Sequence, residues 1–234
     1  MTDLQALLGY YGVDNPGEVE RFRALARAGK DQPAWWRAYR EAASQQYLTF
    51  LGYESSASVI RMFQPLVIPG LLQEEDYARA ILRASGGSAT EKRVEEWVEL
   101  RMRRQELLER PDPPELYFVL DEAALHRWVG GREVMRHQLH RLKKDAELEH
   151  VTLEIVPFSA GEHPGMKGPF SILEFADDRD GDVLFQENPR GDTISRDEEE
   201  EIQPYRKAFD QLRELASKED PEALIDKALQ EMSR

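Results

Sequence analysis

The chain has 234 residues, of which 41% are hydrophobic and 32% are charged, and it contains no cysteine. This composition is typical of a soluble globular protein, and the length is sufficient for one large domain or two small ones. The lack of cysteine excludes disulfides, thiolate metal ligands and cysteine nucleophiles. The formal net charge of −14 opposes contact with phosphate backbones, so we expect this chain alone to bind nucleic acid poorly.

No apolar run approaches the roughly 18–20 residues that a membrane-spanning helix needs. The N-terminal sequence MTDLQALLGYYG also lacks the basic and apolar stretches of an export signal. We therefore expect a cytoplasmic protein that makes no membrane contact.

The first half of the chain is predicted to be mainly helical, because its apolar residues recur at helical spacing. The expected helices cover residues 3–13, 16–28, 34–61, 74–84 and 91–108. Gly12 is expected to cap the first helix, and Gly52 is expected to bend the third. Residues 62–68 should form a short strand or an extended segment.

The sequence PDPP at residues 111–114 is the strongest candidate boundary. After it, alternating apolar residues predict strands, and the longer amphipathic stretches predict helices. The strands are expected at residues 116–120, 151–158, 170–175 and 183–186, and the helices at 133–146, from the capping box 195–198 onward, and from 221 onward. We therefore predict an α+β fold in which a helical region (1–110) packs as one unit with an α+β region (115–234), containing a small mixed sheet.

Three polar residues occupy positions where a buried helical stripe predicts apolar ones. Arg101 and Gln105 continue the stripe of the 91–108 helix, and Glu54 interrupts an apolar face in the 34–61 segment. Charge on a core face is costly unless it is paired. Glu54 and Arg101 are therefore expected to converge, with Gln105 beside them, as a structural ion pair or as the polar end of a ligand pocket.

Aromatic residues gather near the same segment. Trp36 and Tyr39, with Trp35 and Tyr47 nearby, would floor a pocket for a planar ligand or would pack in the core. Core packing is the more usual role of aromatic residues at helical spacing.

The histidines suggest one further candidate. His163 lies in the glycine-rich segment 159–169, which either contacts a ligand or forms an ordinary hairpin connection. His137 and His140 are three residues apart on a helix, but a metal site would need more ligands. No motif for a nucleophile, a metal centre or a cofactor is recognisable, so we predict no catalytic residue, metal or cofactor.

Several short motifs together resemble a known family. The chain is similar to the large C-terminal domain of actinobacterial Xre-type helix-turn-helix regulators, known as domain of unknown function 5753 and often called antitoxin-like. The resemblance covers nearly the whole chain and rests on motifs in this order: LL at 7–8, YGV at 11–13, WW at 35–36, VIPGLLQ at 67–73, YARA at 77–80, RMRRQ at 101–105, LDEAAL at 120–125, VGG at 129–131, QL at 138–139, VPF at 156–158 and GPF at 168–170.

The resemblance implies a regulatory protein without established catalytic residues. Family members usually carry a helix-turn-helix module before the point where this sequence starts, and residues 1–13 are similar to the last helix of that module. We therefore expect a non-catalytic sensor or protein-interaction domain of a transcriptional regulator that binds no operator by itself. Its expected partner is a small molecule or a small acidic protein, and a homodimer is compatible with the sequence. The alternative is a stand-alone biosynthetic enzyme that reuses this scaffold.

Overall fold

The computed structural model describes residues 2–31, 34–177, 180–188, 191–196, 198–216 and 220–232. The chain divides into two compact units, residues 1–38 and 39–234. The first unit contains helices α1 (Thr2–Tyr10) and α2 (Pro16–Asp31). The predicted cap, Gly12, has a φ of +70°, a conformation that glycine adopts without strain. The Asn15 side chain then accepts a hydrogen bond from the Gly17 N–H (2.9 Å) at the start of α2.

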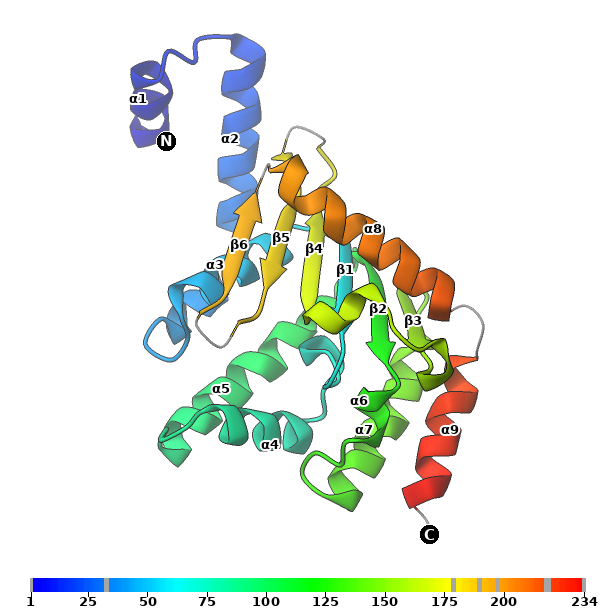
Figure 1. Cartoon of the computed structure of the whole chain (residues 1–234). Helices are drawn as coiled ribbons and strands as arrows, with labels where there is room; N and C mark the ends of the chain where they lie inside the picture. Colours follow the sequence, from blue (N-terminus) through cyan, green and yellow to red (C-terminus); the bar gives the residue numbers. More distant parts are fainter. Residues whose placement is uncertain are drawn as a thin grey trace. The chain divides into compact units, whose positions relative to one another are not determined.

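The second unit is built on a sheet that, in the described residues, has six strands in the order β3-β2-β1-β4-β5-β6 (Figure 1). Strands β1, β2 and β3 are parallel to one another, whereas β4, β5 and β6 continue the sheet in antiparallel pairs. Their bounds are β1 (Val59–Gln64), β2 (Glu115–Asp121), β3 (Val151–Val156), β4 (Phe170–Glu174), β5 (Val183–Gln186) and β6 (Thr193–Arg196). The α+β class with a mixed sheet is thus confirmed, and the central strand β1 comes from the first half of the chain.

Helices and 3-10 turns connect these strands. The α-helices are α3 (Gln45–Glu54), α4 (Glu75–Ser85), α5 (Glu91–Arg104), α6 (Ala123–His126), α7 (Arg132–Asp145), α8 (Glu199–Ala216) and α9 (Pro221–Met232). The 3-10 turns are η1 (Trp35–Tyr39), η2 (Gly70–Leu72), η3 (Gln105–Glu109), η4 (Phe158–Ala160) and η5 (Pro164–Lys167). No helix in the described part of the chain is both long and apolar enough to span a membrane.

The predicted continuous helix 34–61 is wrong. Residues 35–39 form the 3-10 turn η1, and α3 begins only at Gln45, where the Ser44 side chain accepts a hydrogen bond from the Tyr47 N–H (3.1 Å). This cap ends the preceding turn and starts a new helix. The end of the segment is strand β1, whose residues Val59 and Ile60 are β-branched and pair with both β2 and β4.

Strand β6 was not predicted, because Ser195 and Glu198 have the spacing of a capping box. In the structure Ser195 lies within β6, paired with Leu184 of β5, and α8 starts at Glu199. The strand is short and no residue in it is buried, so it lacks the apolar alternation that marks the other strands.

Each face of the sheet packs against helices. On one face α8 crosses the sheet (Figure 1), and its residues Phe209 and Leu212 join a buried core with Phe63, Val119 and Ile172 of the strands. The other face carries side chains of the opposite strand parity, and there Phe50 of α3 stacks on Phe185 of β5 with ring centroids 4.1 Å apart. Helices α3 and α5, which carry the candidate residues Glu54 and Arg101, belong to this second side.

Candidate functional site

A buried ion pair joins α3 to α5. The Arg104 Nε and Nη2 atoms each donate to one carboxylate oxygen of Glu54, both at 2.6 Å, and the two residues are 6% and 2% exposed. Arg104 Nη1 also donates to the Tyr47 hydroxyl at 3.2 Å. Burial opposes the charged form of Arg104, but the nearby Glu54 carboxylate more than offsets this and raises the pKa of the guanidinium. Both charges are therefore satisfied internally, as a structural pair requires.

This pairing corrects the prediction that Glu54 would meet Arg101. Arg101 instead donates from Nη1 to the Oε1 atom of Gln73 (2.9 Å) and is only half-buried. Leu100 is 2% exposed, and the position one turn after it is Arg104. Including Leu100 in the helical stripe would have indicated Arg104 as the buried partner.

Gln105 has a structural role that the sequence did not reveal. Its Nε2 atom donates to the carbonyl oxygens of Gly70 (2.9 Å) and Gln73 (2.8 Å), and its Oε1 atom accepts from Arg141 Nη2 (2.9 Å). Arg141 Nη1 also donates to the Gln73 carbonyl (2.8 Å). These side chains provide hydrogen-bond partners for a buried segment that belongs to no strand.

Gln138 holds the same segment from α7. It is fully buried, donates to the Leu72 carbonyl (2.7 Å) and accepts from the Glu74 N–H (2.7 Å). Its place among Met135, Leu139 and Leu142 on one helical face was a signal for burial. The PGLLQ motif is thus the centre of a polar network that connects α5, η3 and α7.

A pocket of about 280 Å³ opens beside Arg101. The wall includes Tyr47, Leu82, Trp97 and Leu100, and Gly86 lies where an added Cβ would be 2.6 Å from the Trp97 ring. Because Gly86 has no side chain, the α4–α5 connection can pack tightly against the Trp97 ring. The pocket thus has an aromatic and apolar wall with one guanidinium.

Two carboxylates line the same pocket. Glu187 and Asp192 come from the connection between β5 and β6. Burial raises the pKa of the Asp192 carboxyl, and the negative charge of Glu187 raises it further. The pocket therefore combines one cationic and two acidic groups with apolar walls, which is typical of sites for small polar ligands.

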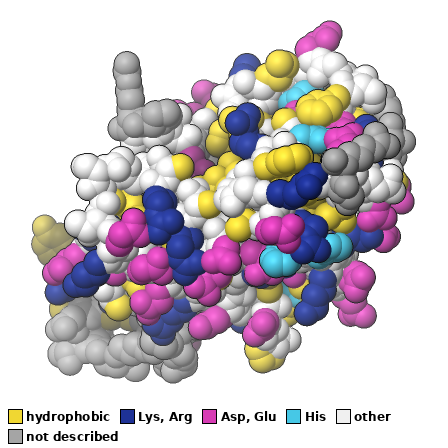
Figure 2. Space-filling model, turned by 90° about the horizontal axis from the view of Figure 1, so that it is seen from below, with side chains coloured by type: hydrophobic (Ala, Val, Ile, Leu, Met, Phe, Trp, Pro, Cys, Tyr) yellow, Lys and Arg dark blue, Asp and Glu magenta, His cyan; other side chains and the backbone are white. Residues whose placement is uncertain are grey.

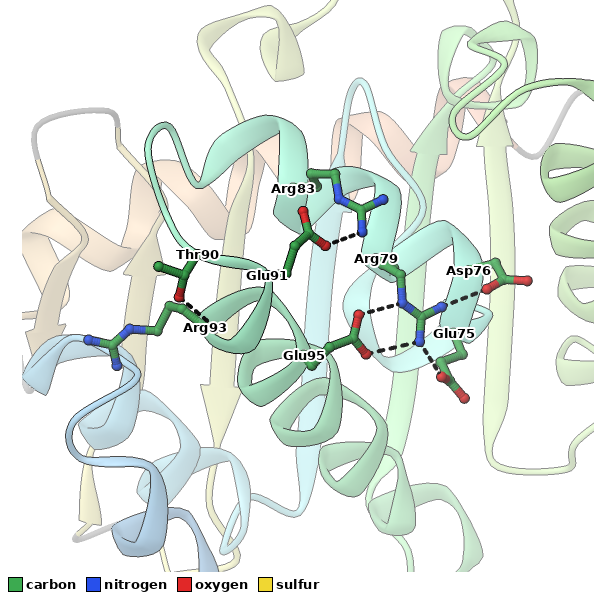
Figure 3. Close-up of polar contacts among 8 residues, drawn as sticks. All are labelled: Glu75, Asp76, Arg79, Arg83, Thr90, Glu91, Arg93 and Glu95. Carbon is green, nitrogen blue, oxygen red and sulfur yellow. Dashed lines mark hydrogen bonds and ion pairs between the residues drawn. The ribbon is translucent and has the colours of Figure 1, made fainter.

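Surface ion pairs fix the two helices that carry part of this pocket. Arg79 of α4 bonds to Glu95 of α5 (2.8 Å), to Asp76 (2.6 Å) and to Glu75 (2.5 Å), and Arg83 bonds to Glu91 (2.5 Å) (Figure 3). Individual exposed pairs stabilise little, but several sharing one guanidinium hold the helices in register. Trp97 and Arg101 are thereby carried on a helix that is fixed along its first turns.

Of the predicted aromatic pair, Tyr39 does not line this pocket. Trp36 belongs to the N-terminal unit, and Tyr39 is the first residue of the second unit. The Tyr39 hydroxyl donates to the Glu99 carboxylate (2.8 Å). Tyr47, which the sequence also suggested, is the aromatic residue of that group that lines the pocket.

His163 is turned inward, toward the end of a strand. Its Nε2 atom is 2.9 Å from Oδ2 of Asp121, the last residue of β2, and its side chain is only 6% exposed. The other ring nitrogen, Nδ1, is buried and has no hydrogen-bond partner among the residues that the structure describes. The carboxyl ends of parallel strands are common positions for active sites, and at this one the imidazole anchors the 159–169 loop to β2.

The two other candidate histidines lie elsewhere. His137 and His140 line a separate pocket of about 830 Å³ beside α7, together with Glu74, Arg141 and Asp145. Burial raises the pKa of the Asp145 carboxyl, although Arg141 partly opposes this. Among the residues that the structure describes, no group of three or more His, Asp or Glu side chains is placed to hold a metal ion.

Comparison with known proteins yields one relationship. No curated protein and no solved structure matches the chain significantly. A model of the family described as a domain of unknown function, DUF5753, matches residues 47–223, a range that includes Tyr47, Arg101, Arg104 and Asp192. The chain therefore belongs to the DUF5753 family, as its motifs predicted.

Proposed function

We propose that this chain is the non-catalytic sensor and interaction domain of a bacterial transcriptional regulator, and that it binds a small molecule in the pocket beside Arg101. The observation that carries the proposal is the position of Arg101. It is half-buried, and within the described part of the chain its guanidinium donates to Gln73, which leaves further guanidinium donors at the pocket.

The composition of the pocket defines the kind of ligand. A guanidinium that is weakly hydrated and planar is suited to a carboxylate or another acceptor group. Glu187 and Asp192 are suited to hydrogen-bond donors or to an amine, and Tyr47 and Trp97 can pack against the ligand body. A small polar molecule that carries both an acidic group and an amine, such as a free amino acid, matches this arrangement.

The alternative function is a stand-alone enzyme, and the Asp121–His163 pair is the observation that favours it. A carboxylate that orients an imidazole is a recurring part of general acid–base sites. Here, however, Nδ1 is buried, so a substrate has no access to it in this structure. We therefore rank this alternative below the sensor function.

We also propose a cytoplasmic location and a further partner. A cytoplasmic regulator domain is expected to contact DNA only through a further module, and a small acidic protein is an additional candidate partner. On the face formed by α4, α5 and α7, acidic and basic side chains are interleaved (Figure 2), and the whole chain carries a net charge of −14. A gel-shift assay should therefore detect no salt-resistant, sequence-specific operator binding by this chain alone.

Substitution of Arg101 tests the proposal. Thermal unfolding of the full chain would be measured with each of the common amino acids, and native mass spectrometry of the freshly purified protein would reveal a retained ligand. We expect one chemical class of amino acid to raise the melting temperature of the original protein. It should do the same for the control Arg132→Leu, which loses an exposed arginine. In Arg101→Leu the protein should remain folded but the ligand-induced increase should disappear.

Two results would contradict the proposal. One is a ligand that stabilises Arg101→Leu as well as it stabilises the original protein. The other is turnover of a small-molecule substrate that is abolished by Asp121→Asn and unaffected by Arg101→Leu, which would favour the enzyme.

A further inference from the structure

A third pocket, of about 400 Å³, lies between the glycine-rich loop and α8. One wall comes from residues 164–170, including η5, and the other from α8 residues that include Tyr205, Lys207 and Ala208. Gln186 and Asn188, after the end of β5, complete the lining. This site is distinct from the Arg101 pocket, although Glu187 lines both.

The loop wall is held in place before any ligand binds. The His163–Asp121 hydrogen bond fixes the start of η5 to the end of β2. Gly165 is buried against the ring of Phe63, which would lie 2.3 Å from an added Cβ. Gly168 then has a φ of +125°, a conformation that other residues rarely adopt. A preformed wall lowers the conformational entropy that binding would cost.

The opposite wall combines an aromatic surface with hydrogen-bonding groups. The Tyr205 ring packs edge-on against Phe170, with ring centroids 5.1 Å apart. Its hydroxyl accepts a hydrogen bond from Gln186 Nε2 (2.7 Å), so the hydroxyl hydrogen is available to donate to another group. Together with Pro164 and Pro169, these rings provide an apolar surface beside polar groups.

The charge of this pocket differs from that of the other two. Two lysines, Lys167 and Lys207, line it against one carboxylate, Glu187. The Arg101 pocket has two carboxylates against one arginine, and the pocket beside α7 has four carboxylates against one arginine and one lysine. Neither Lys167 nor Lys207 forms an ion pair with a described residue. In a chain of net charge −14, this is a local excess of positive charge.

We infer that the pocket between the 159–169 loop and α8 binds a small organic anion with an apolar body, such as an aryl phosphate or an aryl carboxylate. Lys167 and Lys207 neutralise the anionic group, the Tyr205 hydroxyl donates to it, and Pro164, Pro169 and Phe170 pack against the apolar part. The inference is independent of the proposed ligand at Arg101, because none of these contacts involves that residue.

Calorimetric titration of the full chain with phenyl phosphate and with benzoate tests the inference. We expect saturable binding of at least one of them, weakened by added salt because the lysines are exposed to solvent. Phenol, which lacks the charge, and inorganic phosphate, which lacks the ring, should each bind more weakly. These two partial probes separate the charge contribution from the apolar contribution.

Two variants locate the site. Lys167→Met with Lys207→Met removes both charges while keeping an unbranched side chain of similar shape, and should weaken binding of the anion by about tenfold or more. Ala208→Leu fills the apolar part and should weaken it as well. Lys92→Met is the matched control, since Lys92 is 88% exposed on α5 and outside the pocket, and it should leave the affinity unchanged.

The inference is overturned if neither probe binds saturably to the original protein. It is also overturned if the Lys167→Met, Lys207→Met and Ala208→Leu changes leave the affinity as it is in Lys92→Met, because the anion would then bind elsewhere. Melting curves of each variant confirm folding before titration. Loss of Arg101 should leave this binding unaffected, so failure here and failure of the proposed function are distinguishable.

Discussion

Arg101 and Arg104 lie one turn apart on α5, yet their environments are opposite. Arg104 is 6% exposed and makes a two-bond ion pair with Glu54, a further bond to Tyr47 and a close approach to the Phe50 ring, 5.2 Å from its centroid. Arg101 is half-buried, bonds to Gln73 and lines a pocket with two carboxylates. The comparison shows that a charged residue on a buried stripe is structural when its donors are used internally, and a candidate for binding when they are not.

The largest expected effect is on Arg104. Arg104→Leu leaves the Glu54 carboxylate buried without a partner, so the free energy of unfolding should fall by about 3–5 kcal/mol. Urea denaturation measures this loss. The double variant Glu54→Leu, Arg104→Leu removes both charges and should recover much of the stability. Arg101→Leu leaves only the neutral Gln73 Oε1 atom without its donor, so it should cost less, about 1–3 kcal/mol. Equal losses for Arg101→Leu and Arg104→Leu would contradict the distinction between the two residues.

How much of this the sequence predicted depends on the range of the interactions involved. Periodicity found α5, α7, α8 and most strands, because the apolar stripe of a helix and the alternation of a strand are local patterns. It placed Glu54 in the interior correctly, since that residue is 2% exposed. It chose the wrong arginine because the choice depends on where α3 meets α5, and that contact joins residues fifty positions apart.

The buried glutamines show a second limit. Gln73 and Gln138 are almost completely buried, 1% and 0% exposed, because they satisfy backbone groups of the segment after β1. Glutamine side chains are usually exposed, and a sequence does not show which distant carbonyl a side chain will meet. The pocket beside Arg101 could not be predicted for the same reason. Its two carboxylates come from the β5–β6 connection, which is distant from Arg101 in the sequence.

An intermediate effect is expected at Gly70, which contacts both arginines. A Cβ added there would lie 3.0 Å from Arg101 Cδ, from Arg101 Nη1 and from Arg104 Nη1. Gly70→Ala should therefore destabilise the protein by about 1–3 kcal/mol, because Arg104 is held by Glu54 and has little room to shift. Combining it with Arg101→Leu should reduce the cost, since one of the crowding side chains is shorter.

Gly9→Ala is the control for this substitution. Gly9 lies in α1, where an added Cβ meets nothing within 4 Å, and alanine is the better helix former. The melting temperature of Gly9→Ala should equal that of the original protein or be slightly higher. If Gly70→Ala also leaves the melting temperature unchanged, then the guanidinium groups do not pack tightly on the Gly70 backbone. The ion pair with Glu54 would then not hold Arg104 in a fixed position.

The smallest effect concerns Glu174, a partly buried carboxylate that pairs with two arginines. It accepts from Arg61 Nε (2.9 Å) and from Arg206 Nη1 (2.5 Å), and its side chain is 19% exposed. Burial alone would raise the pKa of Glu174, but the hydrogen bonds from the two arginines more than offset this and lower it. The lowered pKa means that Glu174 stabilises the fold above its unfolded pKa of about 4.3, and that this contribution is lost as the pH falls through the folded pKa.

Glu174→Gln should therefore cost about 1 kcal/mol at pH 7, and the difference from the original protein should shrink below about pH 4. Denaturation at several pH values measures this, with the exposed Glu147→Gln as the control that should show no such pH dependence. A constant difference at every pH would mean that Glu174 acts through packing alone, and that its charge, unlike that of Glu54, contributes nothing to stability.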